Sequence, residues 1–255
     1  MFFMPEIIKK YYFFLILAIL LASFFSRNRL KDVRDIDPRV FLPPHQEEAF
    51  DKTPIKLLRD GYSYLIEPLY LYEAGGIVVS KMNYRFFSIY KYNSAFPLDL
   101  CLLWGENARK RVFAAPTIRF TQDCRWCWAQ WGGKLDFEMH EISNNHLIFA
   151  EPGIEARAAS LLKGDQVFIK GKLINVSAAL VGKKGEFDPQ GFTWKSSVKR
   201  NDTGAGACEV IYVEELEILR RAHPLANFLF YLSLYALLLV ILWKIFRFFT
   251  AKAVF

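Results

Sequence analysis

The sequence predicts a mainly β (α+β) periplasmic domain that is flanked by two transmembrane helices. Three observations lead to this fold class. Each end of the chain carries a long uncharged apolar run, the middle is rich in alternating apolar and polar residues, and the chain has 255 residues. That length suits one domain with membrane anchors and is too short for two large domains.

The first apolar run covers residues 11–26 and follows Lys9 and Lys10. As a helix its 16 residues would be about 24 Å long, which is short for a span unless the flanking lysines reach the interface. A basic start before an apolar core also fits a cleavable signal peptide. Because Phe24 and Phe25 occupy the positions where small residues would precede a cleavage site, we predict a retained signal-anchor over residues 1–26.

The second apolar run begins at Pro224 and continues for 20 residues without a charge, to Trp243. As a helix this run would be about 30 Å long, which matches the hydrocarbon thickness of a bilayer. Phe228, Tyr231 and Trp243 lie near its ends, where aromatic residues gather in membrane helices. We therefore predict a transmembrane helix over residues 224–249.

Two spans would place both termini on one side of the membrane and the domain on the other. The flanking Lys and Arg residues do not set the direction, since five lie on the terminal side and six on the domain side. We expect a bacterial inner-membrane protein with a periplasmic domain and cytoplasmic termini. Of the net charge of +7, the middle domain carries only +3, which argues against nucleic acid as a partner.

The chain between the two spans divides into a linker and a folded domain. Residues 27–58 are charged and contain four prolines, so we expect an extended linker there. Residues 59–222 are expected to form the β-rich extramembrane domain. Two strand-like runs surround Gly75 and Gly76, and a helix is predicted over 153–162, between Pro152 and Gly164.

The clearest strand follows that helix, in the run GDQVFIKGKLINV. Val167, Ile169 and Leu173 fall on one face with lysines on the other, as in a half-buried strand. Gly171 inside the run indicates a bend or a bulge of the kind found at barrel corners. Together with the final strand, which ends in IYVEELEIL, the run resembles the opening and closing strands of small OB-type barrels. The domain is therefore expected to contain an OB-like small barrel portion.

Four cysteines, all candidates for disulfides, occur in the predicted domain: Cys101, Cys124, Cys127 and Cys208. The Cys-x-x-Cys pair fits a redox dithiol or half of a zinc site. A zinc site would need further ligands at a suitable spacing, and a thioredoxin-like site would need a strand-to-helix junction. Neither context is present, so we predict structural thiols or disulfides of open connectivity, and no metal or other cofactor.

Asp202 begins the tetrapeptide Asp-Thr-Gly-Ala, which carries the catalytic aspartate in retroviral-type aspartic proteases. In those enzymes the aspartate follows a buried apolar strand, whereas Lys-Arg-Asn precedes Asp202. The apolar pair and glycine expected downstream are also missing. We interpret the segment as a tight turn in which Gly204 and Gly206 adopt positive φ, and we assign no catalytic residue.

Two short motifs supply the candidate binding residues, which are Asn144, Asn145, His146, Trp126, Trp128 and Trp131. The Ser-Asn-Asn-His run is compatible with acid–base chemistry, but no carboxylate partner can be assigned, and the run is typical of a turn between strands. The tryptophans of WCWAQW either form a platform for sugars or planar ligands or pack in the core and beside the membrane.

Four segments, LCLLWG, ISNNHLI, GDQVFIKGKL and RNDTGAGACEVIYVEELEIL, are together similar to an uncharacterised group of bacterial membrane-anchored proteins. The shared pattern ends in Asp-Thr-Gly-x-Gly-Ala-Cys-Glu near the C-terminal strand. The resemblance covers residues 60–219 and implies kinship of fold, with no activity attached. It also implies that Cys101 and Cys208 belong to recurrent motifs, which favours a disulfide or a shared packing role.

We expect a non-enzymatic envelope protein whose domain binds or scaffolds a partner next to the inner membrane. Its partners would be the lipid bilayer and other membrane or envelope proteins, or further copies of itself. Tethering at both ends raises the effective concentration of the domain for membrane-bound partners. A periplasmic thiol-redox protein using Cys124 and Cys127 is an alternative, and a cytosol-facing nucleotide or nucleic-acid binding module with the basic loop VGKKG is a second.

Overall fold

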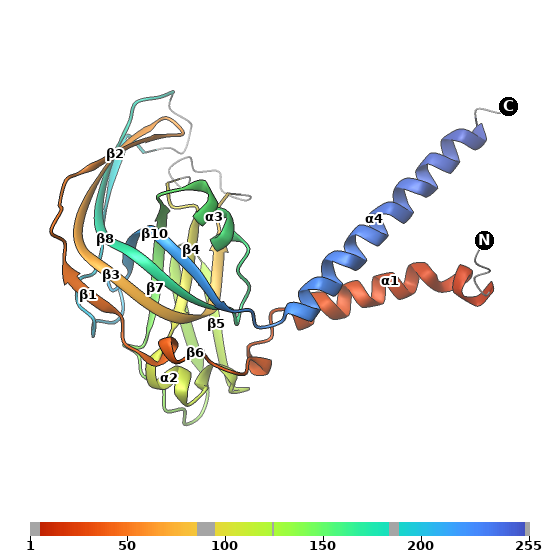
Figure 1. Cartoon of the computed structure of the whole chain (residues 1–255), viewed down its shortest axis with the longest axis horizontal. Coiled ribbons are helices and arrows are strands. Elements are labelled where there is room, and N and C mark those ends of the chain that lie inside the picture. Colours follow the sequence, from red (N-terminus) through yellow and green to blue (C-terminus); the bar gives the residue numbers. More distant parts are fainter. Residues whose placement is uncertain (1–5, 86–94, 124, 184–188, 253–255) are drawn as a thin grey trace. The chain divides into compact units, whose positions relative to one another are not determined.

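The computed structural model describes residues 6–85, 95–123, 125–183 and 189–252, and it divides into two compact units (Figure 1). One unit is helical and joins the two chain ends, residues 1–29 and 223–255. The other unit, residues 30–222, is the β-rich domain. The structure therefore contains a mainly β middle part and helices at both ends of the chain.

The helical unit consists of α1 (Glu6–Ser26) and α4 (Pro224–Lys252). Within Pro224–Thr250 of α4, an 18-residue window has a mean hydropathy of 2.3, and α4 is the one described helix that is long and apolar enough to cross a membrane. The apolar part of α1, Tyr11–Ser26, is shorter. The predicted apolar C-terminal helix is thus confirmed as a candidate membrane span, whereas the span expected over residues 1–26 stays a prediction.

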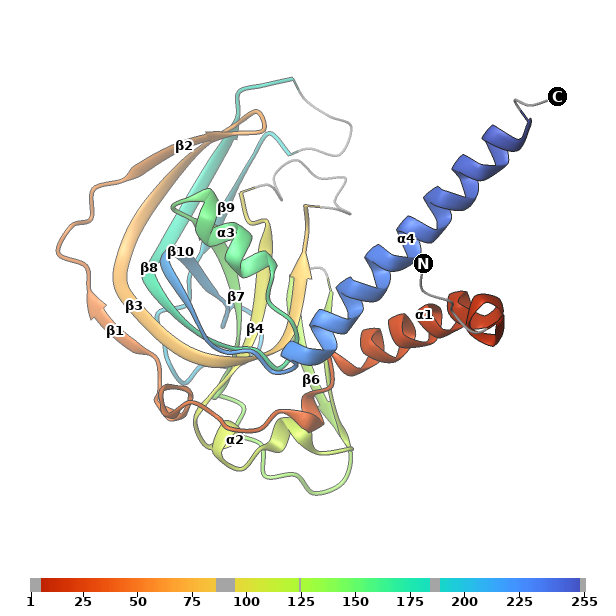
Figure 2. The same ribbon diagram turned by 45° about the vertical axis from the view of Figure 1, so that its right-hand side comes forward.

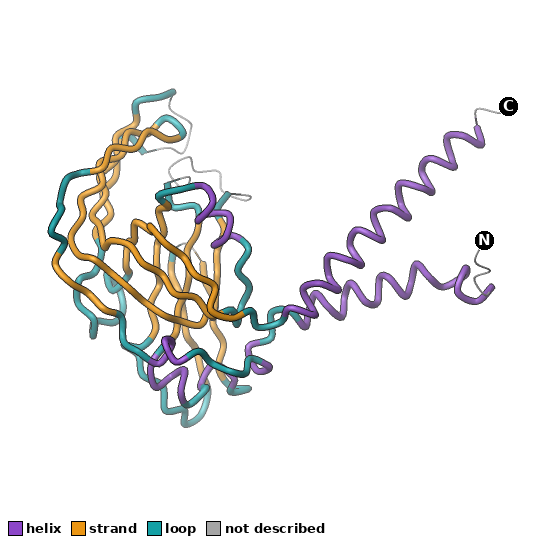
Figure 3. Tube along the Cα trace, viewed as in Figure 1, coloured by secondary structure: helices purple, strands orange, loops and turns teal. Residues whose placement is uncertain are grey.

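The β-rich domain contains ten strands in its described residues, with three 3₁₀ turns and two short helices between them (Figure 3). The turns and helices are η1 (Leu30–Asp32), η2 (Pro38–Phe41), α2 (Gly105–Arg109), η4 (Val112–Ala114) and α3 (Pro152–Ala159). The strands are β1 (His45–Glu48), β2 (Ile55–Arg59), β3 (Tyr62–Asn83), β4 (Leu98–Leu103), β5 (Ile118–Asp123), β6 (Trp126–Trp131), β7 (Ile142–Phe149), β8 (Gln166–Leu180), β9 (Gly191–Lys195) and β10 (Glu209–Arg220).

Five of these strands form a sheet that closes on itself in the order β3–β4–β7–β10–β8 and back to β3. The β7–β10 pair is parallel and the other pairs of the circuit are antiparallel. The long strands β3 and β8 run side by side and curve strongly (Figure 2). β1 and β2 add to β3, β9 adds to β8, and β5 with β6 forms a separate hairpin.

The strand predicted around Gly171 is confirmed in both its faces and its irregularity. Val167, Ile169 and Leu173 of β8 are all fully buried in one apolar cluster. Gly171 pairs with Val213, and the register of β10 against β8 shifts immediately afterwards, as at a β-bulge. A Cβ atom on Gly171 would collide with the carbonyl oxygen of Tyr212, so the strands approach closely only because this residue is glycine.

Two expectations about the first part of the domain are wrong. The two runs around Gly75 and Gly76 are one continuous 22-residue strand, β3. A Cβ on Gly75 would lie 2.5 Å from the carbonyl oxygen of Arg39, so this glycine allows η2 to approach β3 and does not mark a turn.

The segment 27–58 is also not an extended linker. Val33 and Val40 are buried between its charged residues, and β1 and β2 pair with β3. A few apolar side chains with strand partners therefore outweigh the polar composition and the prolines. By contrast, the predicted helix is confirmed as α3, and Gly164 beyond it has a φ of 92°.

Candidate functional site

The Ser-Asn-Asn-His run lies inside strand β7, so its interpretation as a turn between strands is wrong. β7 pairs with β4 on one side and with β10 on the other. Because successive side chains of a strand point to opposite faces, Asn144 and His146 share one face of the sheet while Ser143 and Asn145 share the other. Each of these polar side chains is buried, and each face holds a different network.

The first network surrounds Asp99, which lies opposite His146 in the register of β4 and β7. Asp99 is fully buried, and its carboxylate accepts a bond from Arg125 Nη1 at 2.7 Å and one from the Tyr84 hydroxyl at 3.0 Å. His146 Nδ1 lies 3.0 Å from the same carboxylate. We call Asp99, Arg125, Tyr84 and His146 the Asp99 network. Its buried negative charge is compensated by a guanidinium that is itself only 11% exposed.

The β5–β6 hairpin is held over this face by one covalent and two polar links. A disulfide joins Cys101 of β4 to Cys127 of β6, with a Cα–Cα distance of 6.0 Å. Asn144 Nδ2 donates to the carbonyl oxygen of Arg125 at 2.6 Å, and Asn144 Oδ1 accepts from Gln122 at 2.7 Å. The disulfide spans 26 residues of sequence, for which loop-closure entropy predicts a stabilisation of about 3.5 kcal/mol.

The four candidate cysteines therefore differ in their bonding. Cys101 and Cys127 form the disulfide, and Cys124 lies outside the described residues. Cys208 has no disulfide partner among the residues that the structure describes. Burial, with a smaller contribution from Glu209, raises the pKa of the Cys208 thiol to about 11. Because the thiolate is the reactive form, Cys208 is a poor nucleophile at neutral pH.

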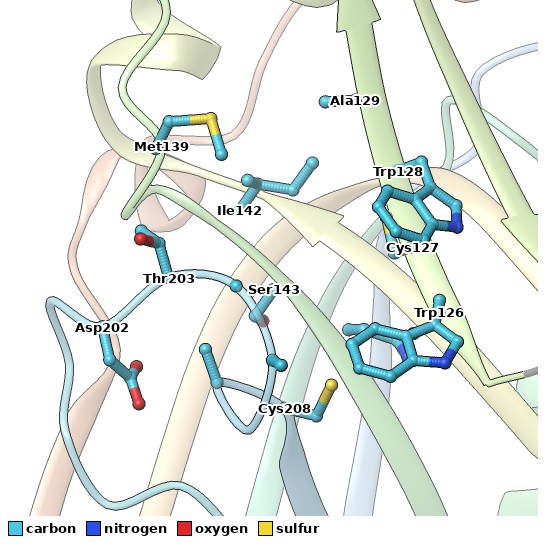
Figure 4. Close-up of a pocket in the computed structure, with 14 residues that line it drawn as sticks. Trp126, Cys127, Trp128, Ala129, Met139, Ile142, Ser143, Asp202, Thr203 and Cys208 are labelled. Carbon is cyan, nitrogen blue, oxygen red and sulfur yellow. The ribbon is translucent and has the colours of Figure 1, made fainter.

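A groove of about 360 Å³ lies beside the hairpin, and we call it the hairpin groove. One wall is Trp126–Ala129 of β6, and the other is Ile142–Asn144 of β7 with the loop 202–208. Figure 4 shows the indoles of Trp126 and Trp128 on one side and Asp202 on the other. Four successive residues of one strand line the groove, which indicates that the groove follows the edge of β6.

Two strand edges without a partner border the hairpin groove. β6 pairs with β5 through all six of its residues, and no described residue pairs with its other edge. β10 begins to pair with β7 only at Glu209, opposite Asn145. The preceding residues Ile142–Asn144 therefore pair with β4 alone within the described residues. Unpaired edges of this kind offer backbone N–H and C=O groups to another chain.

The candidate binding residues separate accordingly. Trp126 and Trp128 are 41% and 51% exposed, and their rings stack with centroids 6.0 Å apart. Trp131, on the opposite face of β6, packs on Phe137 at 4.8 Å. The groove thus brings together Trp126, Trp128 and Asn144. Asn145 and His146 lie buried in the sheet and do not line it.

Sequence reasoning missed several residues of the groove. Met139, Ile142 and Ser143 line it, as does the loop 203–208. That loop was singled out only for Asp202 and for the cysteine at its end. A methionine and an isoleucine in separate segments carry no motif, so only their positions beside Trp128 identify them.

The turn predicted at Asp202 agrees with the structure. Gly204 and Gly206 have φ values of 84° and 89°, and Asp202 Oδ2 accepts a bond from the Ser197 hydroxyl at 2.5 Å. Asp202 lines the groove, but no other Asp or Glu does so among the described residues. An aspartic protease shares a proton between two carboxylates, and this arrangement is therefore lacking in the groove.

The second network lies on the other face of β7 and holds the start of the same loop. Glu209 is buried, and Arg200 Nη1 donates to it at 2.7 Å. Arg200 also donates to the carbonyl oxygen of Ser197 at 2.9 Å and approaches the Tyr72 hydroxyl at 3.4 Å. Burial raises the pKa of Glu209 to about 7, because desolvation outweighs the effect of Arg200. We call Glu209, Arg200 and Tyr72 the Glu209 network.

The chemistry of the hairpin groove is apolar with one negative charge. No Lys, Arg or His lines it in the described part of the chain, which disfavours a phosphate-bearing ligand. Among the described residues there is no group of three or more His, Cys, Asp or Glu side chains that could hold a metal ion. Comparison of the chain with family models, curated proteins and solved structures finds no match.

Proposed function

We propose that this protein is a non-enzymatic, membrane-anchored binding protein whose hairpin groove takes an extended peptide segment of a partner protein. The observation that carries the proposal is the pair of unpaired strand edges, at Trp126–Ala129 and at Ile142–Asn144, that border one groove. An extended peptide that adds to a strand edge gains affinity from backbone hydrogen bonds and specificity from side-chain pockets.

The lining residues select the class of peptide. Trp126, Trp128, Met139 and Ile142 offer apolar and aromatic surface, while Asp202 contributes the one carboxylate. Tryptophan and methionine are well suited to peptide recognition because they bury a large area, and methionine adapts its shape. The preferred segment is therefore apolar, with a neutral or basic residue beside Asp202.

The position of the groove in the fold supports a binding role. The closed circuit of five strands, with α3 between β7 and β8, supports the OB-like barrel predicted from the sequence. In OB-type barrels the second and third strands and the loop before the last strand form the ligand site. Here the corresponding elements are β4, β7 and the loop 202–208. β7 and the loop line the groove, and Cys101 of β4 is joined to the hairpin by the disulfide.

The proposed location is the periplasmic side of a bacterial inner membrane, with α4 and α1 as anchors and both termini in the cytoplasm. The disulfide between Cys101 and Cys127 supports an oxidising compartment. The same bond gives the thiol-redox alternative less support, because Cys127 is joined to Cys101 rather than to Cys124. A cytosol-facing nucleotide or nucleic-acid binding module has less support still, since no Lys, Arg or His lines the groove among the described residues. Of its basic loop VGKKG, Lys184 and Gly185 lie outside the described residues.

The test begins with a photo-crosslinking residue at position 128 of the full-length protein in its membranes, and with the same residue at exposed Phe50 as the control position. We expect position 128 to label one segment of a partner protein, and the double variant Trp126→Ala/Trp128→Ala to lose that segment. Phe50→Ala serves as the matched control for loss of an exposed aromatic side chain.

The labelled segment is then synthesised and tested for binding along a strand edge. We expect the peptide to slow amide hydrogen exchange at Trp126–Ala129 and Ile142–Asn144. Methylating alternate backbone nitrogens of the peptide should weaken binding at least about tenfold, because each lost hydrogen bond costs roughly 1 kcal/mol. Equal binding of the methylated peptide, or unchanged exchange at both edges, would overturn the proposal.

A further inference from the structure

A second pocket, of about 520 Å³, lies on another part of the domain and has the opposite electrostatic character. Three cationic side chains line it, Lys31, Arg119 and Lys163, and no Asp or Glu does so in the described part of the chain. We call it the basic pocket. We propose that the basic pocket binds the phosphate headgroup of an anionic amphiphile at the membrane surface.

Within the described residues, the three cations of the basic pocket have no anionic partner. None of them forms an ion pair with any residue that the structure describes, whereas most buried acidic groups of the domain are already paired. Lys163 is half-buried, and burial alone lowers its pKa. A half-buried ammonium without a counter-ion carries a desolvation cost, which a bound phosphate would offset.

The pocket combines these charges with apolar side chains. Phe113, Ile118 and Phe120 belong to a buried apolar cluster and form part of its lining, and Leu30 lies beside them. A free inorganic anion would gain no binding energy from contact with such an apolar surface. The combination of cations and apolar lining suits a molecule with a phosphate at one end and a hydrocarbon at the other.

The basic pocket lies close to the residues that connect the domain to the two helices. Leu30 is the first residue of the β-rich unit and follows the end of α1 by four residues, a distance of at most about 14 Å along the chain. A Cβ on Gly164, next to Lys163, would lie 2.9 Å from the side chain of Ala222 and 3.9 Å from that of Leu30. Both chain connections to the helices therefore start beside the basic pocket.

This inference rests on the proposed membrane anchoring but does not depend on the hairpin groove. If α4 crosses the bilayer, the residues just before it lie at the headgroup level, and the basic pocket lies at that end of the domain. An anionic phospholipid headgroup is then the phosphate present at the highest local concentration.

The test uses the full-length protein in a neutral detergent, titrated with short-chain phosphatidylglycerol and followed by native mass spectrometry. Short-chain phosphatidylcholine, glycerol phosphate and inorganic phosphate are the comparison probes. We expect phosphatidylglycerol to bind preferentially, and Lys31→Gln, Arg119→Gln and Lys163→Gln each to weaken its binding about fivefold. Lys134→Gln, which removes an exposed lysine outside the pocket, should leave binding unchanged.

Lys163→Arg keeps the charge and should retain most of the affinity, so a folding defect of Lys163→Gln can be distinguished from loss of the site. Binding of inorganic phosphate as tight as that of phosphatidylglycerol would overturn the amphiphile assignment. Equal affinity for phosphatidylcholine, or unchanged phosphatidylglycerol binding in the triple Gln variant, would overturn the site itself. None of these variants touches the hairpin groove, so a failure here leaves the peptide-binding proposal standing.

Discussion

The two faces of strand β7 carry buried acid–arginine pairs that differ in how completely the arginine is removed from water. On one face Arg125 is 11% exposed and faces Asp99, which is fully buried. On the other face Arg200 is 26% exposed and faces Glu209, which is 4% exposed. Both ion pairs are 2.7 Å long, so distance alone does not distinguish them.

This difference indicates that the exposure of the arginine to water determines how strongly each ion pair holds its part of the fold. Arg125 has lost most of its access to water, and removal of Asp99 would take away the carboxylate that this buried guanidinium faces. Both arginines also donate to a backbone carbonyl oxygen, Arg125 to that of Phe96 and Arg200 to that of Ser197, so the difference is that Arg200 keeps partial access to water. We therefore assign the Asp99 network to holding the hairpin on the sheet, and the Glu209 network to a weaker, pH-sensitive hold on the loop that lines the groove.

The largest expected effect is that of Asp99→Ala, which should lower the free energy of unfolding by about 3–5 kcal/mol because the buried Arg125 would lose the carboxylate that it faces. Urea unfolding of the full-length protein in detergent measures the change. Glu47→Gln, in an exposed pair with His45, is the control and should change stability by less than about 0.5 kcal/mol. A loss below about 1.5 kcal/mol for Asp99→Ala would contradict the contrast between the faces.

The next effect concerns the disulfide between Cys101 and Cys127, which lies on the same face as the Asp99 network. The double variant Cys101→Ser/Cys127→Ser should lower the free energy of unfolding by about 3.5 kcal/mol. Alkylation of the unfolded, unreduced wild-type protein should modify at most two of its four cysteines. Modification of three or four, counted by mass spectrometry, would show that Cys101 and Cys127 are not joined.

The Glu209 face should give the protein a pH dependence. The pKa of Glu209 is raised to about 7 in the folded protein, above its ordinary value of 4.5. The folded state therefore binds more protons than the unfolded state between these pH values, and the free energy of unfolding falls by up to about 1.4 kcal/mol for each pH unit between about 4.5 and 7. In Glu209→Gln this dependence of the free energy of unfolding on pH, measured by urea unfolding at several pH values, should disappear. An unchanged dependence would show that other groups cause it.

The smallest effect is expected at Asp202, in the loop that joins the two networks. Asp202→Asn weakens the hydrogen bond from Ser197 and should cost about 1 kcal/mol. Binding of a neutral peptide in the hairpin groove should persist, and a preference for basic peptides should decrease. Fluorescence titration with matched neutral and basic peptides measures both, and complete loss of binding in the folded variant would show that Asp202 has a larger role.

Features that depend on a few neighbouring residues were predictable from the sequence. The apolar helix from Pro224, the alternation of β8 around Gly171 and the turn at Gly204 all follow from local composition and backbone freedom. Their physical basis is short-range, because helix and strand periodicity and positive φ are properties of a segment of a few residues.

The candidate site was only partly predictable. The sequence identified Trp126, Trp128 and Asn144 as binding candidates, but it also proposed Trp131 and His146, which the fold places elsewhere. A polar run such as Ser-Asn-Asn-His is typical of a turn in isolation. It forms a buried strand here because β4 and β10 pair with its backbone and because residues distant in the sequence, such as Gln122 beside Asn144 and Asp99 beside His146, lie next to its side chains.

By itself, then, the sequence determined the mainly β domain, the apolar C-terminal helix and the position of the glycine-rich turn. Only the tertiary structure decided that Cys101 pairs with Cys127, that Asp99 meets Arg125, and that the edges of β6 and β7 border one groove. Each of the two pairs joins residues that are 26 positions apart, and the groove brings together three separate segments of the chain. Their register depends on how the strands assemble, and local propensity does not encode it.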